Sequence, residues 1–459
     1  MMLEKVVSLP ILIKYIKTLV YIYSLPDNIR RLNYIARCIF NNLLNVDFEI
    51  TFDKETFLKQ EGICINYSAE VLNHGLQICP HGLLAEKGVR KIDNLNECEW
   101  KGLFGFFKQE KGNVPFDIFA ASFYLLILYE EYTPERLDKH ERFHHEESLA
   151  YRKGFLEIPI IDRWAYLLKH ELEEKGCDTS SFQLRQYRTI STFDIDHPYL
   201  YRNKGLVKNT GGAVRDLLKG KFTQIKNRIA VQLHLAPDPY FEALLRIEEI
   251  QKQLNRPSYY LFILIAGKSK YDRSIVYSHR RFYNYLKQNQ TATIGLHPSY
   301  CTLRNLKKLM KEKAKLEHIL NRKATTTRQH FLRMHNPETF QELSLAGFQE
   351  DFTLAFAHAP GFRSGTAVPY PFYDIEKEEE TTLLIRPTII MDTTLISHLG
   401  LKPEEALQKI KALIDACKQS GGDYLSLWHN SNLAGTEKEN PWINVFIQSY
   451  KYAISLENN

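Results

Sequence analysis

The sequence predicts an α/β protein in which a smaller mixed α/β domain precedes a larger domain with a mainly parallel sheet, closed or nearly closed. Beyond Arg188, apolar and β-branched runs typical of buried strands alternate with segments of helical periodicity. This alternation indicates parallel strands, because each helix returns the chain to the start of the next strand. The predicted strands are residues 187–193, 258–266, 291–296, 325–332, 352–357, 383–391 and 424–428, and the predicted helices are residues 241–254, 280–288, 303–322, 337–346 and 403–419.

We expect three segments along the chain: an N-terminal mixed α/β domain at residues 1–150, a helical connector at 151–184 and the barrel-like domain at 185–459. In the N-terminal domain, Asp27 can cap a helix that runs through Leu44 with one apolar face. Short strands are expected at residues 49–52, 62–67 and 75–79. A strongly apolar helix at residues 117–132 is expected to be buried on most sides.

The composition indicates a protein with neither a nucleic-acid partner nor a membrane span. The 60 Lys and Arg residues exceed the 54 Asp and Glu residues by only six, spread along the chain. Seven widely spaced cysteines without a CxxC pair indicate reduced thiols. The apolar run at residues 11–23 is interrupted by Lys14 and Lys17, and no small-residue cleavage site follows it. We therefore expect a cytoplasmic protein.

Two polar stretches are ambiguous from the sequence. Residues 135–147 include Asp138, His140, His144 and His145, which are suitable metal ligands, but their spacing fits no known template and favours a solvated loop. The basic stretch at residues 204–228 is either a lid over the substrate or an amphipathic insertion.

Polar, metal-capable side chains recur at the same end of at least four predicted strands. In parallel barrels the reacting groups lie just past the carboxyl ends of the strands. Two carboxylates and an imidazole crowded into four positions also require a cation or a hydrogen-bond network to compensate them. We therefore predict an active site at this edge, formed by Asp194, Asp196 and His197 after the first strand, His297 after the third, Arg328 and His330 within the fourth, and His429 after the seventh.

In the order of these motifs, residues 185–435 resemble the polysaccharide deacetylases, the NodB-homology carbohydrate esterases, whose fold is an irregular (β/α)7 barrel. Thr192-Phe193-Asp194-Ile195-Asp196 is similar to the first family motif, in which one Asp is the general base and a second Asp binds a divalent metal. Most members have these two Asp residues adjacent, whereas one residue separates them here. The resemblance implies that Asp194 is the base and that Asp196 is a metal ligand.

The second family motif is a pair of metal-binding histidines four residues apart, and this chain has only the first of them. Residues 295–301 supply His297 but place Cys301 where the second histidine belongs. Either Cys301 coordinates as a thiolate, or another imidazole replaces it, or the metal is bound weakly or not at all. We favour His330, which falls at the place of the arginine-containing third motif, over His197.

The remaining motifs imply further roles. Leu427-Trp428-His429 matches the fifth motif, whose histidine is the general acid, and the match implies that Arg328 orients Asp194. Residues 351–366, which include Arg363 within residues 361–365, occupy the place of the fourth motif without its usual tryptophan. We also expect Arg363, Trp428 and Tyr300 to contact the substrate. The whole chain is similar to a bacterial group of uncharacterised deacetylase-like proteins with an N-terminal domain of unknown function, through residues 117–119, 129–132 and 297–300.

The resemblance implies a metal-dependent hydrolase that removes N-acetyl groups from an N-acetylated carbohydrate. Asp196, His297 and His330 would hold one divalent metal, zinc or another transition metal such as cobalt or nickel. The metal would make water acidic enough for Asp194 to deprotonate, and His429 would protonate the leaving amine. The alternatives are a catalytically weakened relative that binds carbohydrate or acts as a scaffold, and a hydrolase of another carbon–nitrogen bond. The lack of an export signal favours an intracellular sugar precursor, and the oligomeric state is not predicted.

Overall fold

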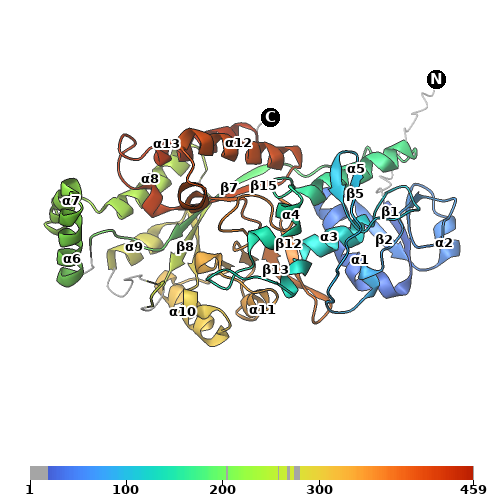
Figure 1. Cartoon of the computed structure of the whole chain (residues 1–459), viewed down its shortest axis with the longest axis horizontal. Coiled ribbons are helices and arrows are strands. Elements are labelled where there is room, and N and C mark those ends of the chain that lie inside the picture. Colours follow the sequence, from blue (N-terminus) through green and yellow to red (C-terminus); the bar gives the residue numbers. More distant parts are fainter. Residues whose placement is uncertain (1–18, 203–204, 257, 266–268, 273–279, 458–459) are drawn as a thin grey trace, which may run out of the picture.

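The computed structural model describes residues 19–202, 205–256, 258–265, 269–272 and 280–457 of the 459-residue chain. It is a mixed α/β molecule with two main sheets (Figure 1). A four-stranded sheet lies toward one end of the elongated molecule, and a larger sheet forms its middle. Two helices, α6 and α7, project at the opposite end.

The N-terminal sheet is entirely parallel, with strand order β2-β1-β3-β4. Its inner strand β1, which was not predicted, is formed by the end of the apolar run at residues 11–23. The predicted helix at residues 117–132 ends early, because Leu128 has a φ of 58°, and a 3-10 turn, Tyr129–Tyr132, completes it. The elements of this half are β1 Leu19–Ser24, α1 Ile29–Ala36 continuing as a π-helix at Arg37–Leu43, β2 Asp47–Thr51, α2 Lys54–Leu58, β3 Ile63–Tyr67, β4 Leu76–Gln77, the hairpin of β5 Cys98–Trp100 and β6 Leu103–Gly105, α3 Ile118–Leu126, α4 Leu149–Arg152 and α5 Ile160–Glu174.

The second sheet has nine strands in the order β12-β13-β11-β10-β9-β8-β7-β15-β14, and only β12 and β13 pair antiparallel. The prediction of a large, mainly parallel sheet is therefore confirmed. No pairing joins β12 to β14 in the described part of the chain, so closure into a barrel is not confirmed. The strands are β7 Arg188–Ile195, β8 Tyr259–Leu264, β9 Ala292–His297, β10 Thr326–Thr327, β11 Glu350–Asp351, β12 Tyr370–Asp374, β13 Glu379–Ile385, β14 Ile390–Met391 and β15 Asp423–His429.

The helices of this half agree with the predicted periodicity. The five predicted helices are found as α8 to α12, while the C-terminal helix α13 was not predicted. The helices are α6 Gly205–Leu218, α7 Phe222–Gln232, α8 Pro239–Gln253, α9 Arg280–Gln288, α10 Leu306–Leu320, α11 Glu338–Leu345, α12 Pro403–Gln419 and α13 Trp442–Ser455. None of the helices in the described ranges is long and apolar enough to cross a membrane.

One predicted strand, residues 352–357, is wrong. The segment is buried, but side chains rather than a neighbouring strand satisfy part of its backbone. The carbonyl of Phe352 accepts hydrogen bonds from Arg328 Nε at 3.0 Å and from Thr388 Oγ1 at 2.9 Å. The apolar composition therefore reflects burial, and the strand itself is the preceding pair Glu350–Asp351.

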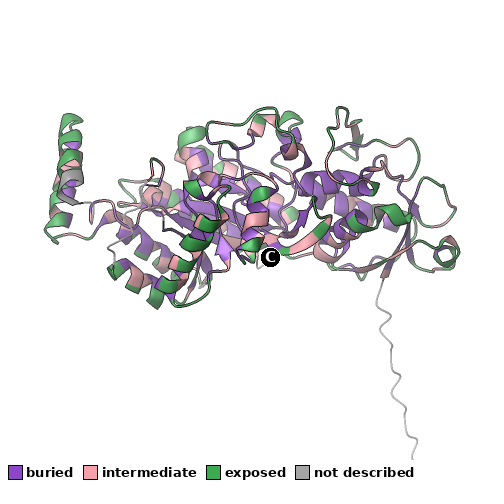
Figure 2. Cartoon of the chain, turned by 90° about the horizontal axis from the view of Figure 1, so that it is seen from below, coloured by how far each residue is buried: buried purple, intermediate pink, exposed green. Residues whose placement is uncertain are grey.

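The two halves pack on each other through a continuous core, which reaches from Val20 in β1 to Ala453 in α13. Figure 2 shows buried residues along both sheets. Polar contacts also join the halves: Arg31 Nε donates to Glu378 at 2.9 Å, and the Tyr34 hydroxyl donates to the carbonyl of Pro371 at 2.9 Å. The domain boundaries near residues 150 and 184 stay a prediction.

Candidate functional site

Strand β7 places Asp194 at the site because its side chains alternate between the two faces of the sheet. Phe193 packs against Phe446 of α13, with ring centroids 5.7 Å apart. Asp194 therefore points to the opposite face, where it is buried. Its Cα partner in the neighbouring strand β15 is His429. Asp196 follows the last residue of β7, so both carboxylates lie at the carboxyl end of the strand.

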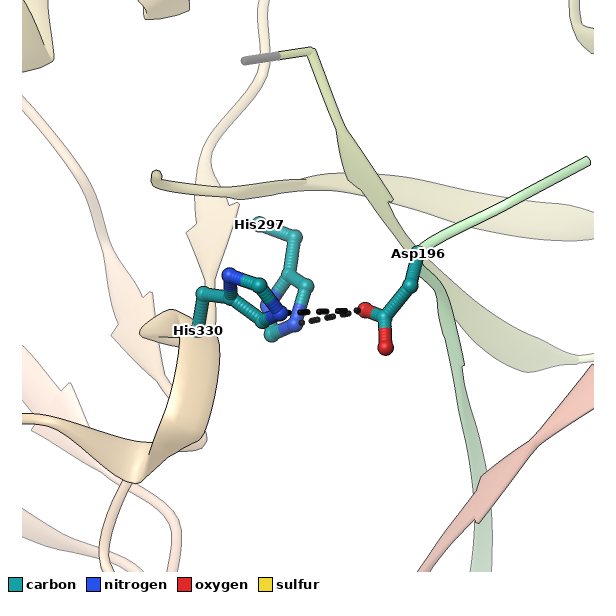
Figure 3. A group of neighbouring side chains, drawn as sticks. All are labelled: Asp196, His297 and His330. Carbon is teal, nitrogen blue, oxygen red and sulfur yellow. Dashed lines mark ion pairs between the residues drawn. The ribbon is translucent and has the colours of Figure 1, made fainter. Parts of the chain in front are cut away.

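Asp196, His297 and His330 converge from three separate segments (Figure 3). His297 ends β9, and His330 begins a 3-10 turn after β10. Asp196 Oδ1 lies 3.3 Å from His297 Nε2 and 3.7 Å from His330 Nε2. This oxygen is buried, yet it accepts no hydrogen bond from the residues that the structure describes. One carboxylate oxygen and two imidazole nitrogens within 4.8 Å of one another are a donor set that suits zinc and similar ions.

The outer nitrogens of both imidazoles are already bound. His297 Nδ1 lies 2.5 Å from the carbonyl oxygen of Arg328, and His330 Nδ1 lies 3.0 Å from a carboxylate oxygen of Asp272. A carbonyl accepts but cannot donate, and the ionised Asp272 likewise only accepts, so both Nδ1 atoms carry the hydrogen. In the neutral rings, each Nε2 therefore directs a lone pair toward Asp196.

The electrostatics keep Asp196 ionised. Burial opposes its charge, but the nearby His330, His297 and His429 outweigh burial and hold the pKa of Asp196 well below its usual range. A carboxylate that stays charged, with one oxygen buried and without a hydrogen-bond partner in the described ranges, is a strong ligand for a cation.

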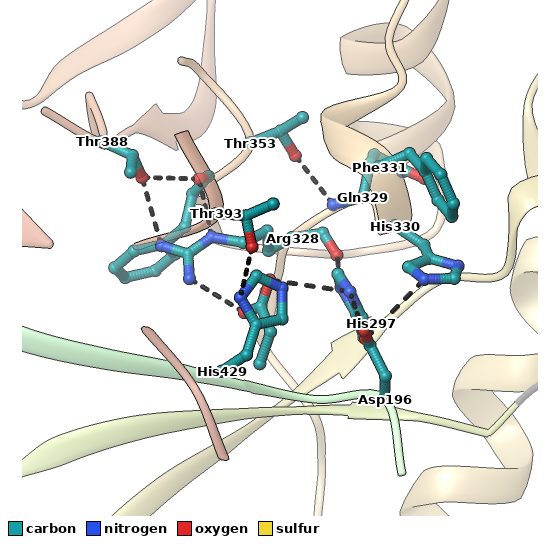
Figure 4. Close-up of polar contacts among 12 residues, drawn as sticks. Asp196, His297, Arg328, Gln329, His330, Phe331, Thr353, Thr388, Thr393 and His429 are labelled. Atoms are coloured by element: carbon teal, nitrogen blue, oxygen red, sulfur yellow. Dashed lines mark hydrogen bonds and ion pairs between the residues drawn. The ribbon is translucent and has the colours of Figure 1, made fainter. Parts of the chain in front are cut away.

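Arg328 fixes the second carboxylate, Asp194. Figure 4 shows Arg328 beside Thr388. Its guanidinium is fully buried and donates to Asp194 Oδ1 at 2.9 Å, to Thr388 Oγ1 at 3.1 Å and to the carbonyl of Phe352. These contacts hold one oxygen of Asp194 in place. The other oxygen, Oδ2, lies 3.6 Å from His297 Nε2 and therefore faces the metal-capable cluster.

His429 is paired with Asp392 on the other side of Asp194. Asp392 is buried, and its Oδ1 lies 2.7 Å from His429 Nδ1, while Asn432 donates to its other oxygen at 2.9 Å. Burial alone would lower the pKa of His429, but Asp392, with smaller contributions from Asp196 and Asp194, raises it to about 10. The imidazolium is therefore the stable form near neutral pH, and its Nε2 carries a proton.

These groups line one cavity of about 460 Å³. Asp194, Asp196, His297, His330 and His429 all contribute to its wall. A second wall comes from the N-terminal half and from two segments beyond strands of the large sheet, one of them the π-helix Thr394–His398. Its residues are Lys139, His140, Arg142, His358 and His398. The ambiguous stretch at residues 135–147 is therefore part of the pocket and not only a solvated loop.

Three residues expected to contact the substrate lie outside this cavity wall. Arg363 is buried against Glu131, with nitrogen–oxygen distances of 2.8 and 2.6 Å. Trp428 faces away from the site, because it alternates with Leu427 and His429, and packs on Phe446 at 5.2 Å. Tyr300 lies behind the wall, with its hydroxyl 3.2 Å from His140 Nδ1.

Two alternative ligands are likewise not in the cluster. Cys301 is exposed in the 3-10 turn Tyr300–Thr302. His197 does not line the cavity, and its carbonyl accepts a hydrogen bond from Asn430.

The sequence analysis missed Asp272 and Asp392, which orient His330 and His429. Asp392 directly follows β14, so the expectation of polar groups at strand ends could have found it. Asp272 lies eight positions after the end of β8, too far for that signal.

Only the N-terminal part of the chain matches a protein-family model. A family model described as "Family of unknown function (DUF7033)" matches residues 20–177, about a third of the chain. No curated protein matches the sequence.

Three solved structures are similar to the chain. A protein of Mycobacterium smegmatis assigned as a polysaccharide deacetylase has a TM-score of 0.39 at 14% identity, over 59% of this chain and 84% of its own. Puue allantoinase has a TM-score of 0.37 at 11% identity, over 58% of this chain and 84% of its own. A protein of Pseudomonas aeruginosa PAO1 assigned as a polysaccharide deacetylase has a TM-score of 0.37 at 11% identity, over 59% of this chain and 85% of its own. With TM-scores this low, we base neither fold nor function on them.

Proposed function

We propose that the chain is a metal-dependent hydrolase that removes the N-acetyl group from an N-acetylated glycan or glycan precursor. The observation that carries the proposal is the convergence in one cavity of three elements: the donor set of Asp196, His297 and His330, the Asp194–Arg328 pair and the His429–Asp392 pair. A hydrolase of an amide needs a base, an acid and a means to polarise the carbonyl, and each element supplies one of these.

The donor set fits a resident divalent ion. The buried Asp196 Oδ1 lacks a hydrogen-bond partner in the described ranges, and two Nε2 atoms with fixed tautomers face it. His330 thus provides the third ligand that Cys301 does not supply. A divalent cation polarises an amide carbonyl and makes water acidic enough to lose a proton near neutral pH.

The protein groups divide the proton transfers between them. Asp194 takes the proton of the attacking water through Oδ2, because Arg328 occupies Oδ1. His429 gives its Nε2 proton to the leaving amine, since Asp392 keeps the ring protonated. Base and acid stand on adjacent strands as register partners, so they can act on the two sides of one amide group.

Metal analysis tests the cation site. The purified protein should hold about one divalent ion, and Asp196→Ala should lose it. Asp93→Ala is the matched control, because its side chain is 84% exposed and remote from the cavity. Equal metal content in wild type and Asp196→Ala would remove the basis of the catalytic proposal.

Acetate release tests the reaction. We expect release from chito-oligosaccharides or a peptidoglycan fragment, and a loss of roughly 100-fold or more in kcat for Asp194→Asn, whose amide cannot act as a base. A protein that binds these glycans and metal but releases no acetate would be the weakened carbohydrate-binding relative instead.

A further inference from the structure

Part of the cavity wall has basic side chains that lack partners among the described residues. Lys139, His358 and His398 line this wall and form no hydrogen bond or ion pair with any residue in the described ranges. His358 and His398 lie with ring centroids 4.2 Å apart. Arg142 in the same lining is neutralised by Asp138, at 2.7 Å, so the uncompensated positive charge of this lining rests on Lys139, and the two imidazoles add ring nitrogens without a partner in the described ranges.

The parts of the cavity lining differ in charge. The carboxylates Asp194 and Asp196 lie among the candidate catalytic groups, whereas the segments that supply Lys139, His358 and His398 contribute no carboxylate to the cavity. Burial and the neighbouring His398, Arg142 and His145 lower the pKa of His358 to about 4. His358 is therefore neutral near pH 7, and it can donate or accept a hydrogen bond beside the charge of Lys139.

We propose that this wall binds an anionic group, a phosphate or a carboxylate, carried by the N-acetylated sugar. The inference rests on the proposed function and narrows its substrate class. Lys139 donates as a point charge, and His358 and His398 donate through ring nitrogens. Lys139 belongs to the region matched by the family of unknown function, so the N-terminal half completes the pocket and selects the substrate.

The test separates the anion site from the reaction. Calorimetry with pyrophosphate measures binding, and acetate release is compared for N-acetylglucosamine 1-phosphate, N-acetylmuramic acid and uncharged N-acetylglucosamine. Lys139→Ala and His358→Gln should each weaken pyrophosphate binding and raise the KM of a charged sugar about tenfold, with the uncharged sugar unaffected. Lys287→Ala, an exposed lysine of α9 outside the cavity, is the control.

The outcomes are distinct. A preference for the 1-phosphate or for N-acetylmuramic acid identifies the anion as phosphate or carboxylate. Pyrophosphate affinity that is absent in wild type, or equal in wild type and Lys139→Ala, overturns the inference. Loss of pyrophosphate binding in the variants, with no acetate released from any sugar, keeps the anion site and rejects the deacetylase proposal.

A second, independent inference concerns the α6–α7 hairpin, residues 205–235. It projects from the body of the molecule, and much of its surface is exposed (Figures 1 and 2). None of its described residues lines the cavity, so the structure does not support a lid over the substrate. Large apolar side chains that are more than half exposed gather here: Val214, Leu217, Leu218, Phe222, Ile229, Leu233 and Leu235.

The hairpin also carries a net positive charge. Residues 205–235 contain six Lys and Arg residues and one acidic residue. The single acidic residue, Asp216, is buried and paired with Arg228 at 2.6 Å, so the exposed charges of the described side chains are all basic.

Polar contacts centred on Arg228 give the hairpin a defined shape. Arg228 bonds Asp216 and also Asn209, at 3.1 Å, and stacks over the Tyr201 ring at 4.7 Å. Gly212 makes room for it, because a Cβ there would lie 2.7 Å from the guanidinium. The apolar side chains are thus presented on a fixed scaffold.

We infer that the hairpin docks on a membrane surface that contains acidic lipids. Leu217, Leu218 and Phe222 form an apolar tip, which Lys219 and Lys221 flank, and this pattern matches an acyl layer beneath anionic headgroups. Self-association through the same face would bring like charges together. Because the hairpin follows β7 and Asp196, docking would hold this edge of the sheet near the lipid surface.

Vesicle co-sedimentation of the full chain tests this inference. The protein should bind phosphatidylcholine vesicles that contain phosphatidylglycerol and not pure phosphatidylcholine. Lys219→Glu/Lys221→Glu should weaken binding about 30-fold or more, and Leu218→Asp/Phe222→Asp should abolish it. Leu345→Asp, which changes a 68% exposed leucine of α11, is the control.

Three results would overturn the inference: no binding to acidic vesicles, equal binding to both vesicle types, or unchanged binding by Leu218→Asp/Phe222→Asp. A dimer in sedimentation velocity that Leu218→Asp dissociates, without vesicle binding, would instead make the face a contact between copies of the chain.

Discussion

Replacing Asp392 by Asn tests whether this buried carboxylate sets the protonation of His429. The pKa of His429 rises from 6.5 to about 10 in the structure, which corresponds to roughly 5 kcal/mol in favour of the imidazolium. Burial opposes this form, and Asp392, 2.7 Å from Nδ1, is the largest contribution that favours it. Without that charge, burial dominates and the pKa should return to about 6.5 or below.

The loss of kcat in Asp392→Asn should be larger at alkaline pH than at acidic pH. With a pKa near 10, His429 stays protonated up to pH 9, and with a pKa of about 6.5 only about 3% remains protonated at pH 8. The kcat of Asp392→Asn should therefore fall about 30-fold at pH 8 and less than about twofold at pH 6. A cation bound at Asp196 would offset only the smaller contributions of Asp196 and Asp194 to the pKa of His429. The kcat of the wild type should therefore fall at a higher pH than the kcat of the variant.

The assay is a pH profile of kcat for acetate release from pH 5.5 to 9.5, with metal content measured for each protein. Asp93→Asn, at an exposed position, should keep the wild-type profile. If Asp392→Asn lost activity by the same factor at every pH, Asp392 would have a structural role only and the acid assignment to His429 would lose its support.

Three further changes test other parts of the structure. Asp272→Asn should weaken metal binding about 10- to 100-fold in a chelator competition, because His330 loses its orienting carboxylate, and unchanged affinity would exclude that role. Arg363→Met should lower the free energy of unfolding in urea by about 3–5 kcal/mol, because Glu131 remains buried and unpaired. Arg37→Met, at a more exposed ion pair, should lower it by less than about 1 kcal/mol. A raised KM without lost stability would indicate that Arg363 contacts the substrate. Burial raises the pKa of Asp162 to about 7, so the folded chain binds more protons than the unfolded chain between about pH 4 and 7 and loses stability as the pH rises. The Tm of Asp162→Asn, measured relative to the Tm of the wild type, should therefore increase by roughly 2 °C or more from pH 5 to pH 8. Tm curves of the two proteins that stay parallel over this range would contradict the prediction.

Local patterns were sufficient to predict the elements that carry the candidate site. Strands β7, β8, β9 and β15 and helices α8 to α12 follow from alternation and helical periodicity, which are properties of neighbouring residues. The same patterns placed Asp194, His297 and His429 at strand ends, and the structure brings these residues into one cavity. The predicted strand at residues 325–332 is only the two-residue β10, so His330 lies in the following 3-10 turn and not within the strand. Two-residue strands such as β10 and β11 are too brief for a periodic signal.

Contacts between distant segments that lie outside the matched motifs could not be predicted. Arg363 and Glu131 are 232 positions apart, and neither sequence neighbourhood indicates that one will bury the other. The basic wall of the cavity depends in the same way on the docking of residues 139–142 against the large sheet, where Arg142 donates to the carbonyl of Phe331 at 2.5 Å. A turn rich in His and Lys looks solvated in the sequence, because its function depends on the surface that it meets.

The position of His330 explains how a chain with Cys301 at the second histidine position can still offer three metal-capable donors. His330 comes from the turn after β10 rather than from the segment after β9, and the turn that holds it is strained. Phe331 and Leu332 both have left-handed backbones, with φ of 64° and 52°, at a cost of about 1–2 kcal/mol each. The hydrogen bonds of His330 offset that cost, from its backbone N–H to the carbonyl of Pro298 at 3.2 Å and from Nδ1 to Asp272. These contacts maintain the strained turn and direct the His330 imidazole toward Asp196. Backbone strain of this kind is typical of functional sites and favours a functional role of the turn over a purely structural one.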